Sequence, residues 1–183
     1  MAKVTFDLVK DLDIFISTAA ISDFEVVGRK NKKISSDSSL SISLKPTIKI
    51  IRNIKKINPD IFLVGFKAEF NITREEIIYC ARKQINDAGT DIVIANDVSH
   101  KDCNFGSDMN EVLIIDDDVL SVPLASKDEI AKIIMKIISD RTSCRWAYCY
   151  YYFLPTTVKI IDFSINIFNL FLLIIFFIKY EFI

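Results

Sequence analysis

The chain has 183 residues, a length that suits a single domain, since domains typically hold roughly 100–200 residues. Lysine and arginine together number 23 and aspartate and glutamate 24, so the net charge of −1 does not favour general nucleic-acid binding. The low content of glycine (4) and proline (4) argues against a collagen-like chain, a disordered linker protein or a Gly-rich phosphate-binding loop.

The cysteines and the one histidine form no recognisable motif. The 4 cysteines contain no CxxC pair, and His100 has no companions at the spacing of metal ligands. We therefore expect neither a zinc site nor a disulfide framework, and a reducing cytoplasm is the expected compartment. A signal peptide is not predicted, because Lys3, Asp7 and Lys10 interrupt the N-terminal apolar residues.

Most of the chain alternates predicted strands and helices. Short apolar runs that are typical of strands buried on both faces occupy residues 13–20, 61–66, 91–95 and 111–115. Two helices are predicted from capping boxes, in which a Ser or Thr and a Glu three residues later satisfy exposed backbone amides. One begins after Thr73 and ends before Gly89, and the other begins after Ser126. A weaker apolar pattern predicts a helix over residues 48–56.

One region interrupts the α/β alternation. Residues 39–44 alternate polar and apolar side chains, which predicts a half-exposed antiparallel strand. They follow a run of cations, Arg29, Lys30, Lys32 and Lys33. We expect the two segments to form a β excursion from the main sheet. A basic loop of this kind suits a polyphosphate ligand, and the alternative is a solvated surface loop.

Candidate binding residues follow the predicted strands, because ligands of open α/β sheets bind beyond the carboxyl ends of the strands. The first strand leads into Ala19, Ala20 and Asp23, and the third leads into Asn96. Asp23 could hold a sugar hydroxyl, a base amine or a metal ion, and its alternative role is a loop or helix N-cap. A nucleophile–base constellation is not visible. The residues alone therefore indicate a nucleotide-binding-like α/β domain.

Five local strings then follow one another in a recognisable order. They are STAAISDF at 17–24, KNKK at 30–33, VGFKAE at 64–69, ANDVS at 95–99 and FGSDMNEV at 105–112. In order and spacing they resemble phosphopantothenate–cysteine ligase (phosphopantothenoylcysteine synthetase), the ligase half of the bifunctional coenzyme A biosynthesis protein. The resemblance assigns residues 1–141 to the C-terminal part of a ligase domain and leaves residues 142–183 as a hydrophobic tail.

The resemblance implies a Rossmann-like, mainly parallel sheet with an antiparallel strand excursion through which the domain forms a homodimer. It also implies a cytoplasmic enzyme of coenzyme A biosynthesis. CTP, assisted by Mg²⁺, would activate the carboxylate of 4′-phosphopantothenate as an acyl-cytidylate and release pyrophosphate. The amine of free cysteine would then attack to give phosphopantothenoylcysteine, and the cysteines of the chain itself would take no part.

Individual residues receive roles from the same resemblance. Lys30, Lys32 and Lys33 match a catalytic flap that contacts the triphosphate and closes over the intermediate. The positions matched to nucleotide binding or to the surrounding crevice are Ala19, Ala20, Asp23, Lys30, Phe66 and Asn96. The string that touches the nucleotide reads Thr47-Ile48-Lys49-Ile50 here, without the proline of the family. Gln84 and Ala88 stand where the family has two lysines, and the neighbouring Lys83 is a candidate substitute.

Both ends of the chain depart from the family. The Gly-rich first strand, the NxSSG motif and the decarboxylase half have no counterpart, so we expect a sheet that is incomplete at the N-terminus and exposes an edge. A separate polypeptide would have to supply the missing part. The alternative function is therefore an inactive nucleotide-binding or membrane-tethered remnant of the fold.

The tail, residues 142–183, has few charged residues and holds most of the aromatic ones. Residues from about 160 to 178 approach the ~20 apolar residues of a transmembrane helix, although Asp162 interrupts them. One alternative is a frame-shifted translation product of A/T-rich DNA. Another is an apolar extension that docks on the incomplete sheet.

Overall fold

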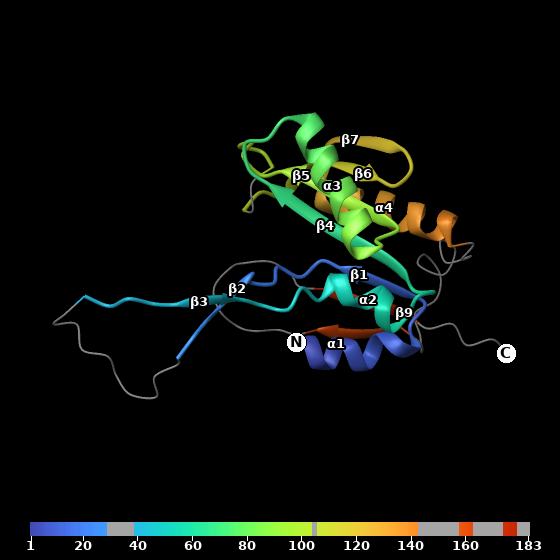
Figure 1. Ribbon diagram of the computed structural model, residues 1–183. Helices are drawn as coiled ribbons and strands as arrows, with labels where there is room; N and C mark the ends of the chain where they lie inside the picture. The colour runs from blue at the N-terminus through green and yellow to red at the C-terminus, as the bar shows by residue number, and fades with distance from the viewer. Residues whose placement is uncertain (29–38, 104–105, 143–157, 163–173, 179–183) are drawn as a thin grey trace.

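The computed structural model describes residues 1–28, 39–103, 106–142, 158–162 and 174–178 (Figure 1). The helices are α1 (Ala2–Leu8), the 3-10 helix η1 (Val9–Asp11), α2 (Ile51–Ile57), α3 (Arg74–Ala88) and α4 (Lys127–Arg141). The strands are β1 (Ile14–Ser17), β2 (Phe24–Val26), β3 (Leu44–Pro46), β4 (Phe62–Glu69), β5 (Ile92–Asp97), β6 (Met109–Ile115), β7 (Val119–Ser126), β8 (Val158–Asp162) and β9 (Ile174–Ile178).

The described strands form one mixed sheet in the order β7-β6-β5-β4-β1-β9-β8, with β2 and β3 as a separate ribbon. The centre of the sheet is parallel, since β1 pairs with β4 and β4 pairs with β5 in parallel register. The four predicted strands are confirmed as β1, β4, β5 and β6. Next to the parallel centre, β6 runs antiparallel to β5 and pairs with β7. The apolar pattern did not predict β7 because much of this strand is exposed, including Leu120 and Leu124.

Helices cover both faces of the sheet (Figure 1). On one face, α4 packs Ile130, Ile134 and Ile138 against strand residues such as Val64. On the other face, α1, η1 and α2 pack against residues that include Leu63, and α3 packs against β5 and β6. Leu63 and Val64 are neighbours on β4 that point to opposite faces, and both are fully buried. This double coverage explains why the central strands are continuous apolar runs.

The helix ends follow the capping signals of the sequence. Both predicted capping boxes are present, Thr73 with Glu76 at α3 and Ser126 with Glu129 at α4. The α3 helix ends at Gly89, whose φ of 70° lies in the left-handed region that favours glycine. The helix predicted over residues 48–56 is confirmed as α2 but begins later, because the Thr47 amide donates to the Asp23 carbonyl at 2.9 Å and holds this end of the chain beside β2.

The β excursion is present as an antiparallel ribbon of β2 and β3 that projects away from the sheet (Figure 1). Its position was predicted wrongly, because the strand expected over residues 39–44 lies at Leu44–Pro46. A strand needs a partner for its backbone groups, and β2 pairs only through Phe24–Val26. Residues 39–43 therefore stay outside the strand, although the Val27 amide donates a hydrogen bond to the Ser43 carbonyl.

Beyond Thr142, which caps the end of α4, the described parts of the tail are strands. β9 pairs antiparallel with β1, and β8 pairs antiparallel with β9. The helix predicted from about 160 to 178 is therefore wrong at both of its described ends, and among the described residues no helix has the length and apolar character to cross a membrane. Isoleucine-rich segments favour strands, and the edge of β1 opposite β4 offers unpaired backbone groups. That edge, which was expected to be exposed, pairs with β9 instead.

Candidate functional site

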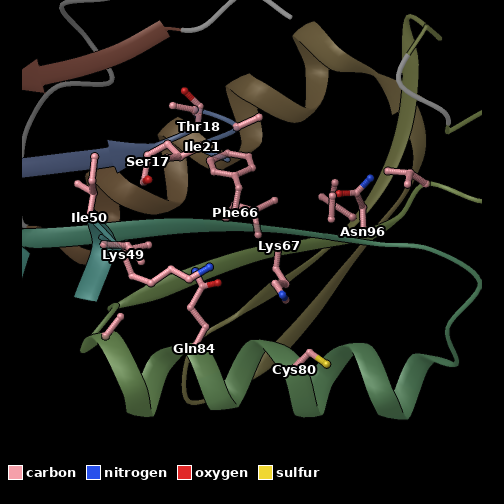
Figure 2. A pocket seen from close by; sticks show the side chains of 18 of the residues that line it. Ser17, Thr18, Ile21, Lys49, Ile50, Phe66, Lys67, Cys80, Gln84 and Asn96 are labelled. Carbon is pink, nitrogen blue, oxygen red and sulfur yellow. The ribbon is translucent and has the colours of Figure 1, made fainter. Parts of the chain in front are cut away.

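A groove of about 1000 Å³ opens at the carboxyl ends of β1, β4 and β5. Its lining comes from the loop after β1, the residues before α2, the ends of β4 and β5, and the facing sides of α3 and α4. The groove extends around both faces of the end of β4. Phe66 points from β4 away from α3, whereas Lys67 points toward α3 (Figure 2). The volume is at the upper end of the range for small-molecule sites.

The loop after β1 supplies the first wall of the groove. Ala19, Ala20 and Asp23 line it. Because the side chains of the two alanines are small, a ligand in the groove can approach the backbone of this loop. The Asp23 carboxylate forms an ion pair with the ammonium group of Lys49. This hydrogen bond and charge hold the pKa of Asp23 below its ordinary value, so the carboxylate is ionised at neutral pH. The Thr47 hydroxyl donates to the Ser22 carbonyl at 2.6 Å and joins the two segments.

The α3 helix supplies the opposite wall. Lys83 and Gln84 line the groove from successive positions on this helix. The Gln84 side chain points from α3 toward β4 (Figure 2), and its Nε2 atom is buried without a hydrogen-bond partner among the described residues. Gly65 makes this approach possible, because a Cβ atom built on Gly65 would lie 2.1 Å from Gln84 Nε2. Glycine at this position of β4 therefore leaves room for the amide.

The end of β5 supplies the floor. Asn96 lines the groove, and its Nδ2 atom donates to Asn110 Oδ1 of β6 at 3.3 Å. The next residue, Asp97, accepts hydrogen bonds from the backbone amides of Asn71 (3.0 Å), Ile72 (3.3 Å) and Ser99 (2.8 Å). Burial works to raise the pKa of Asp97, but the hydrogen bonds from Ser99, Ile72 and Asn71 outweigh it and lower the pKa to about 2. Asp97 thus ties the β4–α3 turn to the end of β5.

The structure brings together most of the residues that the sequence singled out. The groove is lined by Ala19, Ala20, Asp23, Phe66, Lys83 and Asn96, which come from separate segments of the chain. Lys30, Lys32 and Lys33 lie outside the described residues. Thr47, Lys49 and Lys67 also line the groove and were not assigned roles of their own. A signal for them existed, because Thr47 and Lys49 belong to a string noted for nucleotide contact and Lys67 follows Phe66 in VGFKAE.

Comparison with known proteins identifies the kind of domain. The family of the DNA/pantothenate metabolism flavoprotein C-terminal domain matches residues 1–141. A "Coenzyme A biosynthesis bifunctional protein CoaBC" from Thermococcus kodakarensis is 43% identical over 124 residues, which cover 67% of this chain and 30% of that protein. Its counterpart from Methanocaldococcus jannaschii is 38% identical over 136 residues, which cover 74% of this chain and 33% of that protein. The chain therefore spans about a third of the length of these curated relatives.

Solved structures agree with this match. The DNA/pantothenate metabolism flavoprotein from Streptococcus pneumoniae aligns with a TM-score of 0.66 and 26% identity, covering 76% of this chain and 68% of that chain. The C-terminal domain of a CoaBC protein aligns with a TM-score of 0.58 over 78% of this chain and 61% of that chain, and its 22% identity supports the fold alone. The chain belongs to the family of the DNA/pantothenate metabolism flavoprotein C-terminal domain.

Proposed function

We propose that the chain carries the nucleotide site of a phosphopantothenate–cysteine ligase and acts in coenzyme A biosynthesis. The observation that carries the proposal is the groove, which gathers Asp23, Phe66, Lys83 and Asn96 at the carboxyl ends of the parallel strands. The family match and the relatives named as coenzyme A biosynthesis proteins support it. The groove by itself fits both the ligase and the nucleotide-binding remnant, and the relatives named as coenzyme A biosynthesis proteins favour the ligase.

The groove offers complementary groups for a nucleoside triphosphate. The ionised Asp23 can accept hydrogen bonds from a base amine or from ribose hydroxyls, and Phe66, which is 38% exposed, offers apolar surface beside them. Lys49, Lys67 and Lys83 bring positive charge to the same space, although Lys67 also pairs with Glu69 at 2.9 Å. Such cations stabilise the negative charge of a triphosphate, most of all as charge develops on the leaving pyrophosphate.

The proposed reaction has two steps. In the first step, a carboxylate oxygen of 4′-phosphopantothenate attacks the α-phosphorus of CTP, and the bond to pyrophosphate breaks to leave an acyl-cytidylate. In the second step, the amine of free cysteine attacks the acyl carbon, CMP leaves with the bonding electrons, and the amine loses a proton. Lys30, with Lys32 and Lys33, is proposed to close over the phosphates during the first step. We propose CTP, rather than ATP, as the nucleoside triphosphate that is consumed.

The resemblance implies Mg²⁺, and the described groove does not fit a magnesium ion held by the protein. Its carboxylates are Asp23 and Asp87, and each forms an ion pair, with Lys49 and with Arg52 respectively. Mg²⁺ is often bound through one or two carboxylates together with substrate phosphates. We therefore propose that Mg²⁺ enters on the phosphates of CTP, with no carboxylate of the described groove as its ligand.

Two partners are part of the proposal. The relatives are about three times longer than the matched region, so a polypeptide that carries the decarboxylase domain and the first part of the ligase domain is the expected complement. A second copy of the chain is expected at the β2–β3 ribbon. Phe24, Val26 and Leu44 on this ribbon are 53%, 56% and 57% exposed, and apolar surface of this kind indicates an interaction site.

The test measures nucleotide binding and turnover separately. CTP and ATP are titrated into the full chain by calorimetry, and pyrophosphate release is then measured with Mg²⁺, 4′-phosphopantothenate and cysteine, with and without the complementary polypeptide. Asp23→Ala should weaken CTP binding about 10–100-fold, since a hydrogen bond to a charged group contributes about 1.5–3 kcal/mol. Asp60→Ala, which removes an exposed carboxylate elsewhere, serves as the control.

The outcomes distinguish the alternatives. Pyrophosphate release that requires 4′-phosphopantothenate would support the ligase activity. Loss of this release in the Lys30→Ala variant would support the flap assigned to Lys30, Lys32 and Lys33. CTP binding without pyrophosphate release in either mixture would refute the ligase and support the inactive remnant. Equal CTP binding by the Asp23→Ala and Asp60→Ala variants would refute the assignment of Asp23.

A further inference from the structure

A cluster of three metal-ligating side chains lies beside the groove, at the turn between β5 and β6. One ring nitrogen of His100, the Sγ atom of Cys103 and a carboxylate oxygen of Glu111 all lie within 4.8 Å of one another. His100 and Cys103 belong to one turn, in which the Cys103 amide donates to the His100 carbonyl at 3.0 Å. Glu111 comes from β6. Imidazole, thiolate and carboxylate are the ligand types of zinc sites.

The donor atoms lie near enough to one another to converge on one tetrahedral metal ion after small movements. Metal–ligand distances of ~2.0–2.3 Å place neighbouring donors ~3.3–3.6 Å apart in such a site. His100 Nδ1 lies 2.8 Å from Glu111 Oε1, so this pair must open slightly. The side chains of His100 and Glu111 are 58% and 44% exposed, which leaves them free to rotate around a metal ion. Cys103 is only 4% exposed and supplies the fixed, inner ligand.

A further carboxylate is placed to orient the histidine. Asp97 Oδ2 lies 3.9 Å from His100 Nε2, the ring nitrogen opposite the one that faces Glu111. The backbone amides of Asn71, Ile72 and Ser99 hold Asp97 in place. Histidine ligands of metals commonly donate their second ring N–H to a carboxylate, which fixes the ring and makes it a better ligand. Asp97 is therefore placed as a positioning residue for His100, whose ring must move closer than the present 3.9 Å to donate a hydrogen bond to it.

We propose that His100, Cys103 and Glu111 bind one zinc-like divalent ion, with the fourth coordination position open to water or a small ligand. Cys103 lines the main groove, whereas His100 and Glu111 line a smaller cavity of about 150 Å³, so solvent can reach the site from two sides. A thiolate and an imidazole favour zinc over magnesium. The site is thus separate from the Mg²⁺ proposed to enter with CTP, and it does not depend on the proposed ligase activity.

The test uses the full chain with Cys80, Cys144 and Cys149 replaced by serine, so that Cys103 is the one thiol left. Co²⁺ alone is the probe, because a cobalt–thiolate bond gives a charge-transfer absorption band. We expect this band to saturate at one equivalent of Co²⁺ and to disappear when Zn²⁺ but not Mg²⁺ is added. Circular dichroism and thermal unfolding establish that each variant is folded.

Substitutions at exposed ligands decide the proposal. His100→Ala and Glu111→Gln change exposed side chains and should each weaken Co²⁺ binding at least about tenfold. Asp97→Asn removes the carboxylate beside the His100 ring and should also weaken Co²⁺ binding, by about 10–100-fold. Absence of the thiolate band at one equivalent would overturn the proposal and leave only the contact between His100 Nδ1 and Glu111 Oε1. An equally strong band in folded His100→Ala protein would overturn it as well.

Discussion

Replacing Asp97 by asparagine tests the contact that holds the groove's floor to the β4–α3 turn. The wild-type carboxylate accepts three backbone amide hydrogen bonds, and its pKa is lowered from the ordinary value of 3.8 to about 2. At 1.36 kcal/mol per pKa unit, ionised Asp97 contributes about 2 kcal/mol to the free energy of unfolding. An asparagine offers one acceptor oxygen and turns an N–H donor toward the same amides.

The pH dependence follows from the lowered pKa in the folded state. The stabilisation from Asp97 is fully present above the unfolded-state pKa of about 4 and is lost as the pH falls toward about 2. Urea unfolding of wild type and Asp97→Asn in the presence of a metal chelator should therefore differ by about 2 kcal/mol near neutral pH. The difference should shrink progressively below a pH of about 4, because the carboxyl group of the unfolded wild-type chain then binds a proton that the folded protein binds only near a pH of about 2.

Asp60→Asn is the matched control, because Asp60 is an exposed carboxylate between α2 and β4. We expect it to change the free energy of unfolding by less than about 0.5 kcal/mol. A difference between wild type and Asp97→Asn that is absent near neutral pH would refute the reasoning. A difference that stays constant down to a pH of about 3 would show that the effect is steric and independent of the carboxylate charge.

Two further substitutions probe how the chain builds the groove walls. Gly65→Ala should destabilise the protein by about 1–3 kcal/mol in thermal unfolding, because its Cβ would meet Gln84 Nε2 at 2.1 Å and Ile51 Cδ1 at 3.1 Å. The same change should cost less in a Gln84→Ala background, and equal costs would contradict the proposed clash. Thr73→Ala should lower the free energy of unfolding by about 1 kcal/mol, because it removes the hydroxyl that accepts from the Glu76 amide at 3.3 Å. Thr73→Ser should retain most of the stability, and equal losses in the two variants would contradict a capping role.

Local signals in the sequence were sufficient for the core of the fold. Apolar runs predicted β1, β4, β5 and β6, because helices cover both faces of these strands and most residues of the runs are buried on one face or the other. The capping boxes at Thr73 and Ser126 depend only on neighbouring backbone and side chains, so they too could be predicted. The strand β3 was displaced because its position depends on pairing with β2, and β7 was missed because much of it is exposed.

The sequence by itself determined that this is an α/β domain, indicated its resemblance to a ligase family, and predicted Ala19, Ala20, Asp23, Phe66 and Asn96 as residues of one site. Only the tertiary structure decided which groups face one another there, because the Asp23–Lys49 pair and the approach of Gln84 to Gly65 join segments distant in the chain. The tail shows the same division. Its composition resembled a membrane helix, yet pairing with β1 depends on an open sheet edge that composition does not record. The cluster of His100, Cys103 and Glu111 likewise has no metal-binding spacing in the sequence, since the fold of β5 against β6 brings its donors together.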